Sequence, residues 1–152
     1  MMKFAADRML GKLAKWLRIL GYDTLYSRSL SNDKFLELAD KDRVLLSRNT
    51  KILGKVPPDR LIFVEANDPK MQIREIVRLL GLKPNPHDFF TRCTVCNGLL
   101  DRVTSKDVIG KVPDHVWAAH RRFSGCTVCG RIYWQGSHLA RSRQEIRRLL
   151  KA

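Results

Sequence analysis

Short apolar runs recur through the first half of the chain, each of the length expected for a buried strand. We predict strands at Lys3–Ala6, Tyr22–Tyr26, Val44–Leu46 and Leu61–Val64. Between these runs apolar and charged residues are mixed, and their spacing changes from that of a strand to that of a helix.

Helical spacing is clearest at positions 9–20, where apolar residues recur every three or four positions. Gly21 follows at the usual place for a helix C-cap. We predict a second, short helix capped by Asn32 or Asp33, and a third over 71–80. The polar face of the first helix carries the basic residues Arg8, Lys12, Lys15 and Arg18.

The order of strands and helices predicts an α/β fold with a parallel sheet flanked by helices. Pro84 and Pro86 break this pattern, so we place a domain boundary at 83–87, between a first domain (1–86) and a second (87–152). No stretch approaches the roughly 20 apolar residues of a membrane span, and the first residues lack a secretory signal. We expect a cytoplasmic protein without a membrane contact.

The net charge of the chain indicates which class of partner it binds. The chain of 152 residues has a formal net charge of +14, which attracts polyanions such as nucleic acid. A basic but inert surface is the alternative. The charge is concentrated after residue 115, where Glu145 is the single acid among Arg121, Arg122, Arg131, Arg141, Arg143, Arg147, Arg148 and Lys151. This concentration favours a binding surface.

The four cysteines form two identical CTVC motifs, at 93–96 and 126–129. Two Cys-x-x-Cys turns supply four thiolates, which is a complete tetrahedral ligand set for Zn²⁺. A redox-active motif is the alternative, but it usually occurs once, at the start of a helix. We therefore predict a small C-terminal zinc ribbon in which Cys93, Cys96, Cys126 and Cys129 hold one structural zinc ion.

An aromatic and polar string follows the second motif. Tyr133 and Trp134 lie beside Ser137 and His138 in the basic segment, a composition typical of surfaces that stack bases and contact phosphates. The alternative is that the two aromatic side chains pack the core of the ribbon. For Ser137 and His138 we favour the functional interpretation.

Polar residues also follow the predicted strands. Asp7 comes after the first strand, Asp33 begins the next helix, Asn49 follows the third strand and Asp68 the fourth. Ligands of parallel sheets gather at the carboxyl ends of strands, and oxygen ligands there suit Mg²⁺ or Mn²⁺. For each acid alone, capping a helix is the alternative.

Four blocks resemble the Mut-seven C-terminal RNase-domain family: KFAADRMLGKLAKWLRILGYDT, RVLLSRN, RCTVCNGLL and CTVCGRIYWQGSH. The resemblance spans nearly the whole chain. It implies a PIN-like nuclease domain over 1–86, followed by a zinc ribbon with a basic C-terminal helix over 87–152. It also implies a metal-dependent endoribonuclease whose first acid is Asp7 and whose helix acid is Asp33. The family usually has Thr-Arg-Asp after the third strand, whereas this chain has Ser47-Arg48-Asn49.

Two main interpretations follow. In the first, Asp7, Asp33, Asn49 and Asp68 bind Mg²⁺ or Mn²⁺ for RNA hydrolysis, while Arg8 and Arg48 contact phosphates. In the second, the missing carboxylate at Asn49 has impaired catalysis, and the protein binds RNA, such as ribosomal RNA or the ribosome. Its RNA-binding residues are then Arg121, Arg122, Arg131, Tyr133, Trp134, Ser137, His138, Arg141 and Arg143. DNA binding through the ribbon is a third interpretation, to which the first domain adds nothing.

Overall fold

The computed structural model describes residues 1–151 and divides into two compact units. The first unit is Met1–Phe90, and the second begins at Thr91. The boundary predicted from the sequence, at 83–87, precedes this division by a short segment that contains a 3₁₀ turn, η3 (Pro86–Asp88). The PIN-like nuclease domain and the zinc ribbon stay predictions for the first and the second unit.

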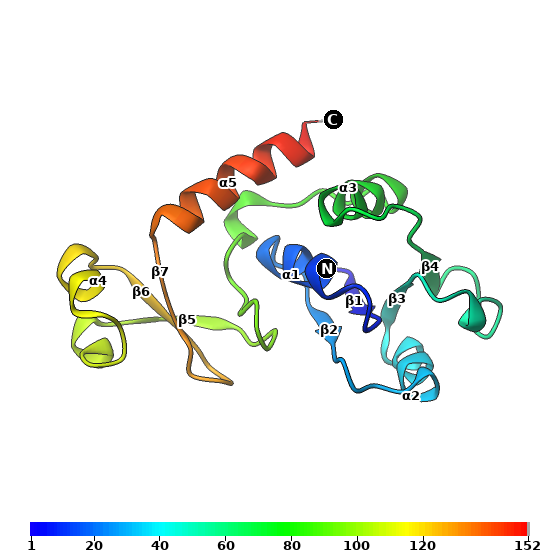
Figure 1. The fold of residues 1–152 in the computed structure, drawn as a ribbon, viewed down its shortest axis with the longest axis horizontal. Coiled ribbons are helices and arrows are strands. Elements are labelled where there is room, and N and C mark those ends of the chain that lie inside the picture. Colours follow the sequence, from blue (N-terminus) through cyan, green and yellow to red (C-terminus); the bar gives the residue numbers. More distant parts are fainter. Residues whose placement is uncertain (152) are drawn as a thin grey trace. The chain divides into compact units, whose positions relative to one another are not determined.

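The first unit is built on a parallel sheet of four strands in the order β2-β1-β3-β4 (Figure 1). The predicted parallel α/β sheet with flanking helices is thereby confirmed. The strands are β1 (Lys3–Ala6), β2 (Thr24–Tyr26), β3 (Arg43–Ser47) and β4 (Leu61–Phe63).

Helices cover both faces of this sheet. In Figure 1, α2 and α3 lie on opposite sides of the strands, and α1 packs against α3. Phe35 of α2 packs on Ala5 and Leu45, which point to the same face of the sheet from neighbouring strands. The helices are α1 (Gly11–Ile19), α2 (Asn32–Glu37) and α3 (Pro69–Leu79), with 3₁₀ turns η1 (Leu38–Lys41) and η2 (Thr50–Ile52).

Gly21 ends α1 as predicted, through a left-handed turn with φ of 95°. The Gly21 N–H donates to the Arg18 carbonyl (3.0 Å), and the Tyr22 N–H donates to the Leu17 carbonyl (3.0 Å). This pair of bonds is a Schellman motif, which satisfies carbonyls at the helix end. A Cβ at Gly21 would lie 2.5 Å from the Asp88 carbonyl oxygen, so the position requires glycine for space as well as for conformation.

Three details of the sequence-based helices are wrong. The cap of α2 is Ser31 rather than Asn32 or Asp33, because its hydroxyl accepts the Lys34 N–H (3.3 Å). Met9 precedes α1 and its side chain is exposed. Arg18, predicted on the polar face of α1, is buried, and its Nε donates to the Thr24 carbonyl (2.9 Å).

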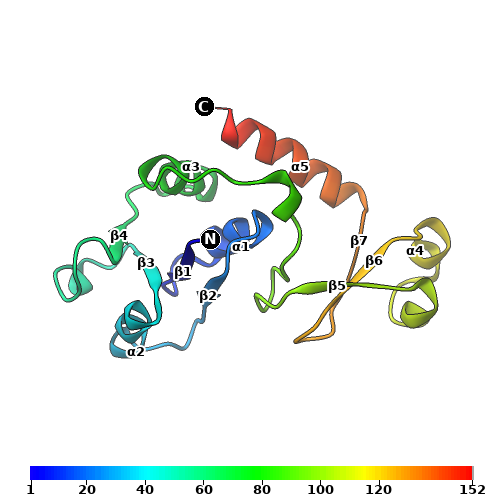
Figure 2. The ribbon, with the colours of Figure 1, turned by 180° about the vertical axis from the view of Figure 1, so that it is seen from behind.

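The second unit contains an antiparallel sheet of three strands in the order β5-β6-β7, seen from behind in Figure 2. Phe123 packs with three valines of the connection between β5 and β6. None of the helices in residues 1–151 has the length and the apolar character needed to cross a membrane. The elements are β5 (Leu100–Val103), η4 (Ser105–Val108), α4 (Asp114–Ala119), β6 (Phe123–Cys126), β7 (Ile132–Trp134) and α5 (Ser137–Leu150).

Candidate functional site

The strand order places a switch point between β1 and β3. From β1 the chain moves to β2 on one side, and from β2 it crosses to β3 on the other side. Ligands of open parallel sheets bind outside the carboxyl ends of strands at such a point. Asp7 follows β1 and the segment 47–49 ends β3, so these residues meet at the switch point.

Asp7 is buried at this edge and its carboxylate is held from both sides. The Asp7 Oδ1 atom accepts the Met9 N–H (2.9 Å), which makes a tight turn before α1. The Asp7 Oδ2 atom accepts the Ser47 hydroxyl and the Arg48 N–H (3.3 Å). These three donors fix the direction of the carboxylate.

A surface depression opens over this carboxylate. Asp7 and Arg8 line it from β1, and Asn32 and Asn49 line it from α2 and the end of β3. The Asn49 Nδ2 atom donates weakly to Asn32 Oδ1 (3.4 Å), while Asn49 Oδ1 accepts the Lys51 N–H (3.0 Å). We call this the Asp7 depression: one carboxylate that faces two carboxamides.

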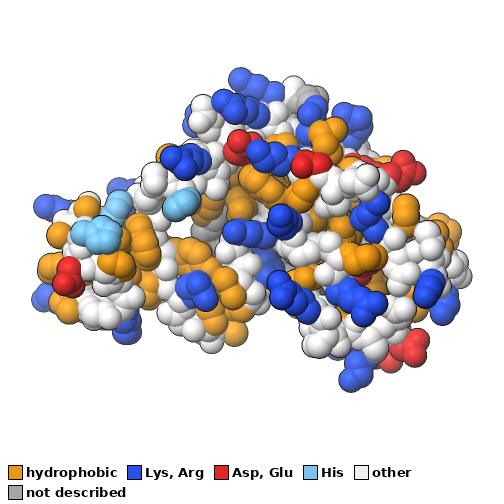
Figure 3. Space-filling model, in the orientation of Figure 1, with side chains coloured by type: hydrophobic (Ala, Val, Ile, Leu, Met, Phe, Trp, Pro, Cys, Tyr) orange, Lys and Arg blue, Asp and Glu red, His pale blue; other side chains and the backbone are white. Residues whose placement is uncertain are grey.

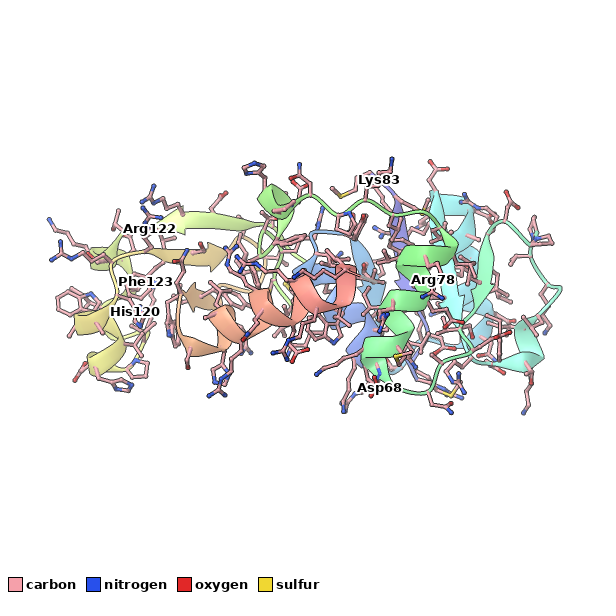
Figure 4. All side chains as sticks on the ribbon, turned by 90° about the horizontal axis from the view of Figure 1, so that it is seen from above. Asp68, Arg78, Lys83, His120, Arg122 and Phe123 are labelled. Carbon is pink, nitrogen blue, oxygen red and sulfur yellow. The ribbon has the colours of Figure 1, made fainter. Side chains whose placement is uncertain are left out.

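Two of the predicted catalytic acids lie elsewhere. Asp33 is exposed and does not line the depression. Asp68 caps α3, where its Oδ1 accepts the N–H groups of Lys70 (3.0 Å) and Met71 (3.2 Å); Figure 4 shows it at the beginning of that helix. Within residues 1–151, these acids form no group of three or more ligands, so the expected convergence of carboxylates is absent there.

Arg48 also has a different place from the one predicted. Its guanidinium donates to the carbonyls of Val64 (2.7 Å), Glu65 (2.6 Å) and Ala66 (2.9 Å), and to the Asn67 side chain (2.6 Å). The guanidinium therefore links the end of β3 to the segment after β4. Because it donates to these protein acceptors, it is not the exposed phosphate ligand that was predicted. Arg8, in contrast, lines the depression with an exposed side chain.

The donor set of the Asp7 depression fits one hard cation. Carboxylate and carboxamide oxygens are ligands for Mg²⁺ or Mn²⁺, and Mg²⁺ is often bound by one or two carboxylates together with substrate phosphates. One carboxylate from Asp7, with Asn32 and Asn49 beside it, meets this minimum. A pair of metal ions needs more negative charge than these residues supply.

The second site is the cysteine cluster, which the structure assembles as the spacing predicts. The ligand atoms of Cys93, Cys96, Cys126 and Cys129 all lie within 4.8 Å of one another. The Sγ atoms of Cys93 and Cys129 are 3.7 Å apart, and those of Cys96 and Cys126 are 3.3 Å apart. A tetrahedral zinc with bonds of about 2.3 Å requires sulfur separations of about 3.8 Å. The cluster can therefore hold a metal ion such as Zn²⁺.

Each CTVC motif closes on itself by the same backbone bonds. In the first, the Cys93 N–H donates to the Gly98 carbonyl (2.7 Å), and in the second the Cys126 N–H donates to the Arg131 carbonyl (2.9 Å). Asn97 and Gly130 take left-handed conformations at the two turns. The pairing of Leu100 with Cys126 then brings the motifs together across β5 and β6.

Backbone N–H groups also point at the sulfurs. Burial acts to raise the pKa of Cys126, but the N–H groups of Cys129 and Val128, both 3.4 Å from its sulfur, lower that pKa to about 6. At Cys96 the Gly98 N–H acts to lower the pKa, yet burial and the neighbouring thiols raise it to about 12. A thiolate raises the pKa of a neighbouring thiol, because two negative charges so close together repel each other. A bound divalent cation neutralises this repulsion.

Tyr133 belongs to this cluster. Its hydroxyl lies 3.0 Å from the Cys93 sulfur and 3.4 Å from the Thr94 hydroxyl. Burial and this contact raise the pKa of Tyr133 to about 12, so the phenol stays protonated and donates to the sulfur. Trp134 packs against the valine and phenylalanine core of the unit. Both aromatic side chains are half-buried, and their contacts correspond to the packing alternative considered above.

The other predicted RNA-binding residues lie on the surface of the second unit. All seven have exposed side chains, and Figure 4 shows Arg122 beside the start of β6. They come from the segment before β6, from the second CTVC turn and from α5. These residues are Arg121, Arg122, Arg131, Ser137, His138, Arg141 and Arg143.

Sequence reasoning missed two polar residues that line the Asp7 depression, Ser27 and Asn32, and it missed Ser47, whose hydroxyl donates to Asp7. Asn32 directly precedes Asp33, and the sequence analysis predicts the charged residue, Asp33, as the metal ligand. Because Ser31, and neither Asn32 nor Asp33, caps α2, Asn32 is the first residue of the helix and lines the depression. The capping preference of Ser31 is the signal that identifies this phase.

Comparison with known proteins gives one match. A family model described as the Mut7-C RNAse domain matches residues 2–146, nearly the whole chain. No curated protein matches the chain. No solved structure matches it.

Proposed function

The chain belongs to the Mut7-C RNAse domain family, and on this premise we propose that it binds RNA and hydrolyses RNA phosphodiesters at the Asp7 depression. The observation that carries the proposal is the position of Asp7, a buried carboxylate at the switch point of a parallel sheet. The depression above it is lined by further oxygen donors and by one exposed cation, Arg8.

In this proposal Asp7, with Asn32 and Asn49, would hold one Mg²⁺ or Mn²⁺ ion at which an RNA phosphate binds. Such an ion activates water and stabilises the charge that develops on the phosphodiester. Ser47 and the Arg48 N–H orient the Asp7 carboxylate, and Arg8 would attract the phosphate. The segment 64–67, fastened by the Arg48 guanidinium, keeps the neighbouring strand end in place.

For the second unit we propose a zinc ribbon. Four cysteine ligands leave no open coordination position, so the zinc is structural. The sheet of three short strands buries little apolar surface beyond its valine and phenylalanine core, which makes a metal ion a needed source of stability. The basic residues of this unit then present charge to RNA.

A second candidate function is RNA binding without cleavage, as in a ribosome-associated protein. Asn32 and Asn49 favour it, because the Asp7 depression has two carboxamides where further carboxylates would bind a cation more strongly. Carboxamides coordinate a metal through oxygen but add no negative charge.

Cleavage of labelled single-stranded RNA in the presence of Mn²⁺ distinguishes these candidates. We expect Asp7→Asn to reduce the cleavage rate by roughly 100- to 1000-fold, since losing metal-assisted stabilisation costs several kcal/mol of transition-state energy. Asp33→Asn and Asp68→Asn make the same chemical change outside the depression and serve as matched controls. Both are expected to retain most of the activity.

The outcomes are distinct. No cleavage by the unsubstituted protein, together with tight binding of the same RNA, supports the second candidate. Loss of cleavage in Asp33→Asn with full activity in Asp7→Asn would remove the depression from the mechanism.

A further inference from the structure

Three cations of helix α5 and its C-cap, Lys151, lie on one side of the helix, and Arg143 lies beside this group. With 3.6 residues per turn, Arg141, Arg147, Arg148 and Lys151 fall within an arc of about 120°. All four side chains are exposed, and none of them takes part in an ion pair within residues 1–151. Figure 3 shows Lys and Arg side chains over α5. We call these four residues the α5 basic stripe.

The opposite side of α5 is apolar and covered. Ile146 is buried, and Leu139, Leu149 and Leu150 are half-buried. A basic helix that inserts into a lipid surface must offer its apolar side, and here that side is not free. What α5 presents to a partner is therefore charge, which fits a polyanion and does not fit the acyl layer of a membrane.

The aromatic residues before α5 do not extend this surface. The Tyr133 hydroxyl is directed to the Cys93 sulfur and Trp134 packs on the core, so both half-buried side chains serve the interior of the second unit. The stripe itself consists of Arg and Lys side chains, which make charge-assisted contacts to phosphates. Phosphate contacts carry no direct sequence information, and they make affinity strongly dependent on salt.

A region of the same unit provides the contrast. Arg102, Lys106 and Lys111 are also exposed, but acids are interleaved with them in the sequence. Asp101 precedes Arg102, and Asp107 lies near enough to Lys111 for the lysine to help lower the pKa of Asp107, after the hydrogen bonds from Thr104. Cations and acids thus alternate in this region, whereas on α5 a single acid, Glu145, accompanies the four cations of the stripe.

We propose that the α5 basic stripe is the docking surface for the RNA phosphate backbone, which it holds without reading sequence. The proposal rests on RNA as the ligand in the proposed function, but it is independent of cleavage. The stripe spans about 15 Å along the helix axis, from Arg141 to Lys151, at 1.5 Å per residue. That length accommodates several phosphates of one strand.

The test is the salt dependence of RNA binding, measured with the full chain carrying Asp7→Asn so that the RNA stays intact. The triple variant Arg141→Gln, Arg147→Gln, Arg148→Gln removes three cations of the stripe. The slope of log K against log salt should become shallower by about 2, since each phosphate contact to a single strand contributes about 0.7. At 0.1 M salt this corresponds to about 100-fold weaker binding.

The matched control removes the same charge from the mixed surface, as Arg102→Gln, Lys106→Gln, Lys111→Gln, and should leave the slope nearly unchanged. An Arg→Lys triple at the three α5 positions should keep the slope, because phosphate contact needs charge. Uridine and cytidine 20-mers should respond equally. Circular dichroism and zinc content of each variant verify that the second unit is folded.

Three results would overturn the proposal. The first is an equal change of slope in both glutamine triples, which indicates general charge and no docking surface. The second is an unchanged slope in the α5 triple. The third is loss of binding to vesicles of phosphatidylserine and phosphatidylcholine in the α5 triple with RNA binding intact. Cleavage that depends on Asp7 in the unsubstituted protein can persist in each case, so the proposed function is judged separately.

Discussion

The two sites of this protein differ in how the chain assembles them. The cysteine cluster is made of two short turns, each closed by its own backbone bonds, that meet when β5 pairs with β6. The Asp7 depression is lined by residues from four places, namely the end of β1, the segment after β2, α2 and the segment after β3, and it depends on the phase of each of them. The first site joins two locally folded turns and is complete in ligands, whereas the second joins single residues of several elements and has one carboxylate.

The comparison indicates that the need of a site for a metal ion depends on how much negative charge its ligands bring together. Four thiols within 4.8 Å of one another oppose each other's ionisation, and a divalent cation relieves this opposition. Asp7 is stabilised by protein donors from Met9, Ser47 and Arg48 without any cation. We therefore expect the two units to respond very differently to ligand substitution.

The largest effect is expected from Cys126→Ser. A hydroxyl in place of the sulfur removes one ligand of four, and metal binding in such sites contributes about 10 kcal/mol or more to folding. Stoichiometric zinc should be lost, and hydrogen exchange of β5, β6 and β7 should become fast. The sheet of the first unit should keep its protection.

The control for Cys126→Ser is Val128→Ala, in the same turn, where the side chain is 73% exposed. Retained zinc and slow exchange in the serine variant would mean that the cluster is not a zinc site and that the contrast between the two sites is false.

A smaller effect, of opposite sign, is expected from adding charge to the Asp7 depression. The double variant Asn32→Asp, Asn49→Asp should bind Mn²⁺ roughly 100-fold more tightly. A nearby opposite charge in a partly exposed site contributes a kcal/mol or more, which is about tenfold for each carboxylate. Isothermal titration calorimetry measures the change.

Asp33 already provides the matched comparison, since its carboxylate is one residue from position 32. If Asp33→Asn weakens Mn²⁺ binding as much as the double variant strengthens it, Asp33 contacts the ion, and the inference that position 32 of α2 lies at the metal site is wrong. A concurrent rise in RNA cleavage by the double variant would indicate that missing charge limits the natural site.

The smallest effect is expected from Tyr133→Phe, which keeps the ring and removes the hydroxyl near Cys93. Loss of a hydrogen bond to a metal ligand typically costs 10- to 100-fold in metal affinity, and we expect about tenfold. Competition with a chromogenic zinc chelator measures it. Binding of RNA should stay unchanged, because the proposed RNA contact is the α5 basic stripe and the Tyr133 hydroxyl contacts the Cys93 sulfur; a strong loss of RNA binding would instead assign the hydroxyl to RNA.

Much of the architecture was predictable from the sequence. The β1 strand and the end of α1 at Gly21 follow from local patterns, and the four cysteines follow from their spacing. These features depend on a few neighbouring residues. The family was also recognisable from four sequence blocks, and the match over residues 2–146 confirms it.

The depression was harder to predict, because one residue of helix phase decides which side chain faces it. The predicted site residue is Asp33, but with Ser31 as the cap of α2 it is Asn32 that lines the depression. Arg48 has the charge expected of a phosphate ligand, yet tertiary structure presents it with three carbonyl groups. Composition indicates which chemistry is available, and only the fold decides which partner each group meets.

The self-closed CTVC turns have a consequence for synthesis on the ribosome. Cys96 and Cys126 are separated by 30 residues, so the first turn is made well before the second. At roughly 5–20 residues per second, a pair of thiols waits for a few seconds before its partners exist. During that interval the nascent chain carries half of a metal site, exposed to oxidants and to competing metals. Rapid closure of the β5–β6 pair thus protects the newly made protein as well as completing it.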